Sequence, residues 1–476
     1  MTKAAQKLYD LFLAKESTRL FVLLGFAFTL RFLSILPYGN GISLPFRDQN
    51  TYYSLARAIV DDGYLGVPSI PRGPYVQQRQ VNPRPAGFYP AFHDSMAAVW
   101  DSSGFLYGMV PWGKPNSFFE PLYPLLSAGL YVLFGDRFFF WRLVHVLMST
   151  ALVFLIYDIG KRAFKDDRIG MIAGFYAAIY PHFIFYAWIL MAEGFLLLLL
   201  AVGLWAYFHL LDNPRWTWAA LLGIAFGAFV LTRSFLIVFF PFLLLFILLF
   251  LKDRRRWMLT AIAAAAFALA LLPWVVRNYR LQNQFVLLST RSGYNLWMRN
   301  NPYFIADELE AMGVNFPAET LDKLKYREYI LGYPPFTPDQ GEVERNRLLS
   351  REGVKFIKAN PGFFLQLCWI RFKWTIGWKG QGLKGPIMNG ISLLSYGPVL
   401  LGFLASLFLG WKRLKVFLPL WGVVGYFILF YSLTHEGLRY RVPVDPYIIL
   451  CAVFAAVYFY DRFHASSQSV TEKSNA

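Results

Sequence analysis

The sequence predicts an all-α protein that crosses a membrane many times. Of its 476 residues, 57% are hydrophobic and only 16% are charged, and the mean hydropathy is +0.41. This composition is typical of membrane proteins. Apolar runs long enough to cross a hydrocarbon core of about 30 Å recur along the chain, so we expect about ten transmembrane helices. They begin near Leu20, Phe139, Ile169, Gly194, Trp216, Phe235, Trp257, Met388, Val416 and Pro446.

The connectors between these runs predict the orientation. Lys and Arg are concentrated in three short connectors, residues 161–168, 252–256 and 411–415. Because cytoplasmic loops carry an excess of these residues, we place all three inside. The two long connectors, residues 38–121 and 277–387, then face outward, and they hold both signs of charge. The informative polar residues are then expected on the outer face of the membrane.

We expect one membrane-embedded domain over residues 1–464, followed by a disordered cytoplasmic tail over 465–476. In the first outer loop, helices are expected over residues 50–59 and 120–134. The Pro-, Gly- and Arg-rich stretch 66–90 between them should be irregular.

The second outer region should contain helices that lie outside the membrane or along its surface. Thr337-Pro338-Asp339-Gln340 has the pattern of an N-cap, a first-turn proline and a capping-box Gln. The helix that it begins should end at Asn360-Pro361. Residues 363–378 mix aromatic and cationic side chains, which predicts an interfacial helix lining a lateral opening towards lipid.

Charge and cysteine content exclude other classes of protein. The net charge of +17 could indicate nucleic-acid binding, but the cations of the inner loops already serve orientation and attraction to anionic lipid. We expect no nucleic-acid partner. The two cysteines, Cys368 and Cys451, predict neither a structural disulfide nor a zinc site.

Two acidic residues beside expected spans are candidates for catalysis. Asp48 follows the first span, and a carboxylate there can take a proton from a sugar, Ser or Thr hydroxyl as a general base. The alternative is a loop acid paired with Arg47. Glu193 interrupts a leucine-rich run where two spans turn, and an acid so close to hydrocarbon is usually functional or paired. Its alternative role is to complement a helix dipole.

Cations on the same expected side of the membrane are candidates for binding an anion. Arg233 and Arg277 end outward spans, and either could instead extend to lipid headgroups. Arg31, inside the first span, has the same ambiguity. The densest charge cluster is His435, Glu436, Arg439 and Arg441, which would suit a lipid phosphate because guanidinium groups bind phosphate through paired donors. A structural ion-pair turn is the alternative.

The sequence contains no metal-ligand spacing, no phosphate-binding glycine loop and no Ser-His-Asp order. The sequence therefore predicts no particular cofactor. It leaves a divalent metal open, but no ligand spacing supports one. Acids and cations gathered on one face predict a site that joins the sugar of a polyprenyl phosphate to a polar acceptor.

Short motifs run in order from the first outer loop to the last expected span. They are Asp48 with Tyr52 and Ala56; Pro121-Leu122-Tyr123-Pro124; Tyr180-Pro181 before Glu193; Leu231-Thr232-Arg233; Pro273-Trp274 with Arg277-Asn278-Tyr279; Gly293-Tyr294-Asn295-Leu296-Trp297 with Asn300-Asn301-Pro302; and Arg439-Tyr440-Arg441-Val442-Pro443. The element from Gly293 to Pro302 is the most specific. In these motifs the chain resembles the bacterial membrane glycosyltransferases of the GT-C superfamily, in the group that includes protein O-mannosyltransferases and the aminoarabinose transferase acting on lipid A.

This resemblance implies a GT-C-like bundle, a polyprenyl-phosphate-linked sugar donor and an outer-face site centred on an Asp of the first outer loop. Asp48 has that position. The resemblance also adds Tyr294, Asn295 and Tyr440 to the candidate substrate-binding residues. Gln49 follows Asp48 where several relatives have a second acid. That departure leaves the metal requirement open and argues against assuming mannose as the sugar.

The expected function is therefore an inverting glycosyltransferase that moves a hexose or pentose to a hydroxyl of a periplasmic glycan, lipid or protein. Asp48 would be the base, assisted by Glu193, and Arg233, Arg277, Arg439 and Arg441 would stabilise the departing phosphate. One alternative is a transporter or flippase of lipid-linked sugars, which should show polar groups deep in several spans and pseudo-symmetric halves. Another is an O-antigen ligase or polymerase, which differs in its acceptor.

Overall fold

The structure is a computed structural model, and it describes residues 15–41, 47–67, 105–106, 110–111, 113–300, 340–377, 386–435 and 437–474. Helices account for nearly all of these residues. The described strands are two-residue pieces that form two antiparallel pairs. One pair is β1 (Gly66–Val67) with β4 (Lys114–Pro115), and the other is β2 (Phe105–Leu106) with β3 (Val110–Pro111).

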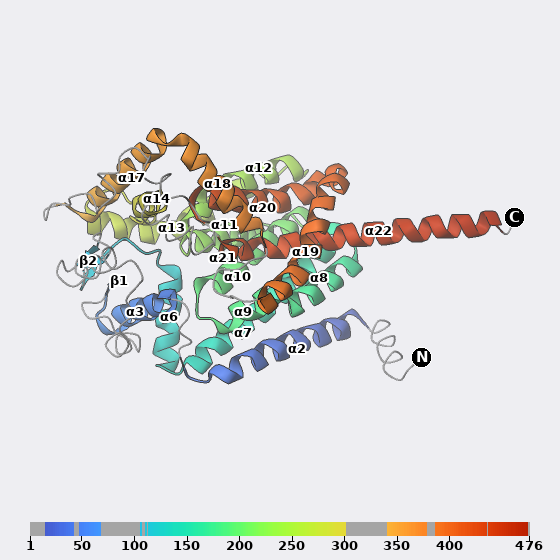
Figure 1. The fold of residues 1–476 in the computed structure, drawn as a ribbon, viewed down its shortest axis with the longest axis horizontal. Helices are drawn as coiled ribbons and strands as arrows, with labels where there is room; N and C mark the ends of the chain where they lie inside the picture. The colour runs from blue at the N-terminus through green and yellow to red at the C-terminus, as the bar shows by residue number, and fades with distance from the viewer. Residues whose placement is uncertain are drawn as a thin grey trace.

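The helices follow one another as α2 (Glu16–Ile35), η1 (Leu36–Tyr38), α3 (Arg47–Asp61), α6 (Leu122–Phe134), α7 (Phe138–Phe164), α8 (Asp167–Ile179), α9 (Pro181–Trp188), α10 (Ala192–Asp212), α11 (Trp216–Val230), η2 (Ser234–Val238), α12 (Phe240–Phe250), α13 (Arg256–Gln282), α14 (Ser292–Arg299), α17 (Glu342–Ala359), α18 (Pro361–Ile376), α19 (Pro386–Leu409), η4 (Trp411–Arg413), α20 (Leu414–Thr434), α21 (Leu438–Arg441), η5 (Val442–Val444) and α22 (Asp445–Ser474). The long helices form a bundle (Figure 1). The helices α3, α6, α14 and α17 gather at one end of it, which we call the loop end, and the start of α2 and the end of α22 lie towards the opposite end.

The expected spans all correspond to helices, but the count of ten is not confirmed. Among the described residues, seven helices are long and apolar enough to cross a membrane, and the bent pair α8 and α9 makes eight if it is one span. The segments predicted to span from Trp216 and Phe235 are shorter apolar helices, Trp216–Val230 and Ser234–Phe250. A straight helix of 15 residues, the length of α11, reaches only about 22 Å, less than the hydrocarbon core.

The short helix α11 is held by close packing against α13. A Cβ atom added to Gly223 would lie 2.2 Å from the carbonyl oxygen of Ala263, so only glycine permits this approach. Small residues at such crossings are how helices associate within a membrane, where hydrophobic burial does not drive them together. The packing places the end of α11, and Arg233 just after it, at the loop end.

The buried side chain of Arg31 donates hydrogen bonds to backbone carbonyls at the break between α8 and α9. These helices meet at an angle of 53°, and Pro181 begins α9. Because proline has no N–H, the carbonyl of Ala177 loses its helical donor. Arg31 donates to the carbonyls of Ala177 and Ala178 at 3.0 Å each. It also donates to Ser149 at 2.7 Å. Arg31 therefore stabilises the break between α8 and α9. Its guanidinium binds these carbonyls rather than an anion or lipid headgroups.

We expect Arg31→Met to lower the free energy of unfolding by about 1–3 kcal/mol, because it leaves buried carbonyls unpaired. Adding Pro181→Ala restores an N–H for Ala177 and should recover part of the loss. Thermal unfolding in detergent measures both effects, with Arg137→Met at an exposed position as the matched control. An unchanged midpoint in Arg31→Met would remove this role.

A second buried arginine fixes the other end of α9. Arg142 donates from Nε to the carbonyl of Trp188 at 3.1 Å and from Nη1 to that of Gly39 at 2.8 Å. Its Nη2 donates to the carbonyl of Gly41. Arg142 thus ties the last residue of α9 to the turn after α2. With both ends of α9 fixed, the chain that leads into Glu193 has a defined path.

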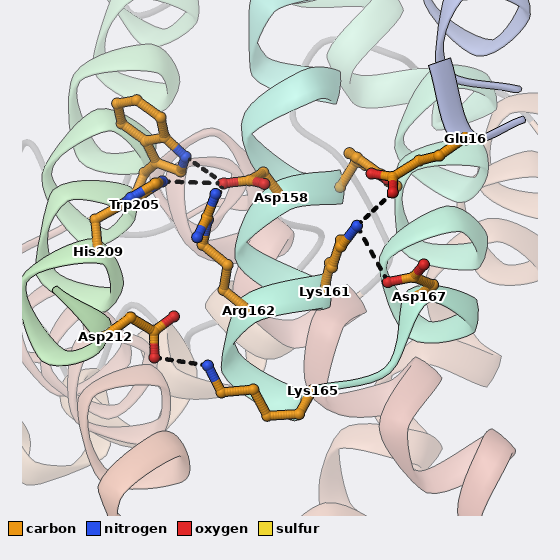
Figure 2. Close-up of polar contacts among 10 residues, drawn as sticks. Glu16, Asp158, Lys161, Arg162, Lys165, Asp167, Trp205, His209 and Asp212 are labelled. Atoms are coloured by element: carbon orange, nitrogen blue, oxygen red, sulfur yellow. Dashed lines mark hydrogen bonds and ion pairs between the residues drawn. The ribbon is translucent and has the colours of Figure 1, made fainter. Parts of the chain in front are cut away.

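Charged side chains connect the helices at the end opposite the loop end (Figure 2). Lys161 lies 2.6 Å from Glu16 and 3.3 Å from Asp167. Lys165 lies 2.6 Å from Asp212 at the end of α10. The predicted inner-loop cations are therefore partly neutralised by acids of neighbouring helices, and they join α7 to α2, α8 and α10.

A buried carboxylate, Asp158, extends this network into the bundle. It accepts a hydrogen bond from Trp205 Nε1 at 2.7 Å and lies 2.5 Å from Arg162 and 3.2 Å from His209 (Figure 2). Glu193 and Asp212 lie at opposite ends of α10, about 30 Å apart along its axis. The network is thus well separated from the loop end.

The loop end has a small core of its own. Aromatic and aliphatic side chains from α3, the segment before α6, α14 and α17 are buried together there, namely Leu55, Phe118, Phe119, Tyr294, Trp297 and Leu349. The carboxylate of Glu342 accepts hydrogen bonds from Ser117 N at 3.1 Å and Gln282 Nε2 at 2.7 Å. Burial raises the pKa of Glu342. This side chain joins the first outer loop to α13 and α17.

Several predicted local boundaries can now be compared with the structure. Helices over residues 50–59 and 120–134 are confirmed as parts of α3 and α6. The N-cap predicted at Thr337 is wrong, because α17 begins at Glu342 after Gly341, and residues 337–339 lie outside the described residues. The tail predicted to be disordered over residues 465–476 is helical up to Ser474, where α22 ends.

Candidate active site

Arg439 connects two carboxylates at the loop end. Its Nη2 lies 2.6 Å from Oδ2 of Asp48, and its Nε donates to Oε1 of Glu193 at 2.5 Å. Nη2 of Arg233 lies 3.6 Å from the same Glu193 oxygen. The structure thus brings together four of the predicted site residues. We call Asp48, Glu193, Arg233 and Arg439 the acid–arginine cluster.

Helix ends place these four side chains. Asp48 lies in the first turn of α3 and Glu193 in the first turn of α10, where a helix dipole favours negative charge. Arg233 lies between α11 and η2, and Arg439 lies on α21. Gly437 reverses the chain before α21 at φ 119°, a value that favours glycine. The cluster therefore depends on four separate helix termini meeting at one point.

The two acids differ in their access to solvent. The side chain of Asp48 is 40% exposed and that of Glu193 is 3% exposed. Burial opposes ionisation of Asp48, but Arg439, Arg233 and Arg291 outweigh it and lower its pKa to about 2. Asp48 is therefore ionised at physiological pH and can be reached by a dissolved molecule. Glu193 is positioned instead to hold Arg439.

Aromatic rings surround the cluster. Tyr52, one helical turn after Asp48, packs edge-on against Tyr123 with ring centroids 4.6 Å apart. Burial raises the pKa of Tyr52 to about 12, so it is neutral at physiological pH. Tyr440 stacks on Tyr431 at 4.6 Å, and the guanidinium of Arg439 lies 5.6 Å from its ring centre. These rings restrict the orientation of Arg439.

His435 borders the site as a neutral side chain. Its ring lies 5.3 Å from that of Tyr440. Burial lowers the pKa of His435 well below its usual value, and Arg299 and Arg371 add to the effect. The positive charge of the site therefore comes from arginines. Glu436, which was part of the predicted charge cluster, lies outside the described residues.

Three further arginines, which were not selected from the sequence, also contribute to the electrostatic potential of this site. Arg291, Arg299 and Arg371 all lower the pKa of His435, and Arg291 also lowers that of Asp48. The guanidinium of Arg291 lies 5.5 Å and 5.6 Å from the ring centres of Phe118 and Phe119. Arg291 precedes α14, and Arg299 is its last residue. The specific motif that begins at Gly293 lies on this helix, so the position of both arginines beside the motif could have identified them from the sequence. Arginines around the site thus outnumber its two acids.

Two of the predicted phosphate ligands have structural partners instead. Arg277 donates to the carbonyls of Asn116 at 2.7 Å and Leu65 at 3.1 Å, so it ties β1 and β4 to α13. Arg441 is fully buried, donates to Asp445 at 2.8 Å and donates to the carbonyl of Gly377 at 2.6 Å. These contacts place both guanidinium groups in packing rather than in the acid–arginine cluster.

Tyr294 and Asn295, implied as substrate-binding residues by the resemblance, lie on α14. Tyr294 is buried in the small core of the loop end, and its ring lies 5.9 Å from that of Phe118. Gly293 N donates to Asn346 Oδ1 at 2.7 Å, and a Cβ at this position would lie 2.0 Å from the carbonyl oxygen of Asn346. The specific sequence element therefore packs α14 against α17.

Among the described residues, no group of three or more His, Cys, Asp or Glu side chains gathers as metal ligands would. Asp48 and Glu193 both contact Arg439, which a cation would have to displace. The residues present therefore do not fit a divalent-metal site at this cluster. Both cysteines are free.

Comparisons with known proteins agree with this architecture. Residues 114–277 match the family model described as dolichyl-phosphate-mannose-protein mannosyltransferase, a segment that includes Glu193 and Arg233. No curated protein sequence matches the chain. Two solved structures of the archaeal oligosaccharyltransferase from Archaeoglobus fulgidus are similar, each at 14% identity over 95% of this chain and 52% of that chain. Their TM-scores are 0.52 and 0.53.

ArnT from Cupriavidus metallidurans is similar at 14% identity over 92% of this chain and 59% of that chain, with a TM-score of 0.44. The chain spans about half the length of the oligosaccharyltransferases that it matches. The fold and the family model confirm the resemblance noted in the sequence. The chain shares the fold of these archaeal oligosaccharyltransferases.

Proposed function

We propose that this protein is a membrane glycosyltransferase that moves a sugar from a polyprenyl phosphate to a hydroxyl acceptor. The observation that carries the proposal is the acid–arginine cluster, in which a partly exposed carboxylate lies 2.6 Å from an arginine on a GT-C fold. The acceptor would be a glycan, lipid or protein at the periplasmic face of the inner membrane.

The arginines suit the phosphate of the donor. Arg439 and Arg233 share the buried Glu193, and Arg291 adds positive charge close to Asp48. A phosphate needs such donors most as its bond to the sugar breaks, when negative charge develops on the leaving oxygen. One matched oligosaccharyltransferase structure contains a dolichol-phosphate and an inhibitory peptide, which supports a lipid phosphate at this fold.

Asp48 would take the proton from the acceptor hydroxyl. The acceptor oxygen then forms a bond to the anomeric carbon while the bond from that carbon to the phosphate oxygen breaks. The lipid phosphate leaves with the bonding electron pair, and the anomeric configuration inverts. A carboxylate with a pKa of about 2 is a weak base. A bound phosphate that draws Arg439 towards itself would raise the pKa of Asp48 and strengthen the base at the moment of transfer.

Glu193 would act by positioning. Its buried carboxylate holds Nε of Arg439 at 2.5 Å and leaves Nη2 directed to Asp48. A planar guanidinium held on one edge presents its other donors in a fixed direction. Glu193 therefore fixes where the departing phosphate meets Arg439.

The proposed sidedness is supported by the cations of the expected inner loops, which lie at the end opposite the cluster. We expect a cysteine in place of exposed Lys114 to be labelled by an impermeant reagent in cells with a permeabilised outer membrane. A cysteine in place of exposed Arg254 should be labelled only after lysis. Labelling of the second site before lysis would reverse the topology and move the cluster to the cytoplasm.

The experiment that tests the function follows the fate of the donor. Purified protein in liposomes with a radiolabelled polyprenyl-phosphate sugar and a membrane extract as the source of acceptor should release polyprenyl phosphate and form a labelled product. A transporter would move the intact donor across the bilayer without cleaving it. Analysis of the product separates transfer to protein, lipid or glycan from the lengthening of an O-antigen.

A further inference from the structure

Gln49, the residue after Asp48, has a buried side-chain amide with no partner. Its side chain is 4% exposed. Neither its Oε1 nor its Nε2 has a hydrogen-bond partner in the part of the chain that the structure describes. Leaving both a donor and an acceptor unpaired in a buried place is energetically costly. The amide of Gln49 therefore indicates a bound molecule that supplies the missing hydrogen-bond partners.

The amide faces a narrow recess with an aromatic lining. The recess has room for about one water molecule or one small polar substituent. Its lining is uncharged throughout and consists of Gln49, Tyr52, Tyr53, Tyr123, Ser127, Phe138, Trp141 and Leu190. Aromatic walls with a few polar groups are typical of sites for small organic molecules.

Two tyrosine hydroxyls of this wall already have partners. The hydroxyl of Tyr53 donates to Asp136 at 2.7 Å and accepts from Arg57 at 3.0 Å. The hydroxyl of Tyr123 lies 3.4 Å from His145 Nε2. The amide of Gln49 has no such partner among the described residues, so both its donor and its acceptor can bind a ligand.

The recess lies beside the acid–arginine cluster. Successive residues of a helix are rotated by about 100°, so Asp48 and Gln49 occupy adjacent faces of α3. Tyr52 belongs to both regions, because it lines the recess and its pKa responds to Asp48, Glu193 and Arg233. A sugar whose anomeric carbon is at Asp48 would thus have other ring substituents within reach of the recess.

We propose that this recess is a subsite for one uncharged substituent of the transferred sugar, and that Gln49 determines which sugar is accepted. This proposal rests on the glycosyl transfer proposed above. A hydroxyl group both donates and accepts, so it matches the two free atoms of the amide. An ammonium or a carboxylate would enter an uncharged, buried wall without a counter-charge, which is unfavourable. The subsite therefore selects a neutral sugar over an amino sugar or a uronic acid.

A series of polyprenyl-phosphate hexoses tests this subsite. In each donor, one hydroxyl is replaced by hydrogen or by an amino group, and kcat/KM is compared for the wild type, Gln49→Leu and Gln49→Glu. At one ring position, the wild type should prefer hydroxyl over hydrogen by about tenfold or more, and Gln49→Leu should abolish that preference. Gln49→Glu should increase relative use of the amino donor at that same position by about tenfold.

Thermal unfolding shows whether each variant is folded, and Asn213→Asp, at the far end of α10, is the control for converting an amide to an acid. If the Gln49 variants slow every donor equally, the recess holds only water and the proposal is overturned. If the wild type cleaves none of these donors and also releases no polyprenyl phosphate in the liposome experiment above, the proposed function itself fails and the subsite with it.

Discussion

Replacing Asp48 by Asn is expected to reduce sugar transfer by at least about a hundredfold, because it removes the basic carboxylate from an oriented site. Asn keeps the size of Asp and most of its hydrogen bonding. The carboxylate is 40% exposed, so loss of its ion pair with Arg439 should cost at most about 1 kcal/mol of stability. The variant should therefore fold and still bind polyprenyl phosphate. Initial rates, thermal unfolding and lipid binding measure these three expectations.

The matched control for this change is Asp61→Asn, which removes a carboxylate from the other end of α3. Asp61 pairs with Arg57 at 2.5 Å, away from the cluster, so full activity is expected. Wild-type turnover in Asp48→Asn would refute the assignment, and loss of folding together with activity would favour a structural role.

The pH dependence has a definite sign. A base with a lowered pKa is active above that pKa and fails only as the pH falls through it. In the free enzyme the pKa of Asp48 is about 2, so kcat/KM should show no acid limb from this group in the accessible range. If bound phosphate draws Arg439 away, kcat should show an acid limb at higher pH.

Replacing Arg439 by Ala should have the second large effect, on both activity and stability. Transfer should fall by about 10²- to 10³-fold, because the departing phosphate loses a preorganised donor. The buried Glu193 would keep only Arg233, at 3.6 Å, and breaking a buried ion pair typically costs about 3–5 kcal/mol. Lys at this position should restore little, since it lacks the planar fork that reaches both acids.

A double variant separates these two consequences. Adding Glu193→Gln to Arg439→Ala removes the unpaired buried charge and should recover most of the lost stability, but it should recover none of the activity. Thermal unfolding and transfer rates, measured on the same preparations, distinguish the effect on stability from the effect on activity. Full activity in Arg439→Ala would remove the cluster from the mechanism.

The sequence was sufficient to locate the helices, although not to count the spans, and to select four residues that the structure brings together. Apolar runs located the spans because hydrocarbon thickness sets a minimum length. Asp48, Glu193, Arg233 and Arg439 could be selected because charges beside membrane spans are costly and need a reason.

The same reasoning could not tell which arginines bind a ligand. An arginine that binds backbone carbonyls and one that binds an anion look alike in sequence, since both lie in or beside apolar spans. Arg31, Arg277 and Arg441 turned out to hold carbonyls or a buried acid. The contacts of Arg291 and Gln49 join segments far apart in the chain, so the sequence could not predict them.

The proposed transfer is tested most directly by native mass spectrometry of the purified wild type, Asp48→Asn and Arg439→Ala proteins. The account predicts a bound polyprenyl phosphate on the wild type and a sugar-loaded form that accumulates on Asp48→Asn, which binds the donor without using it. Arg439→Ala should carry neither. Absence of any such lipid from both the wild type and Asp48→Asn, or equal retention by Arg439→Ala, would contradict the account.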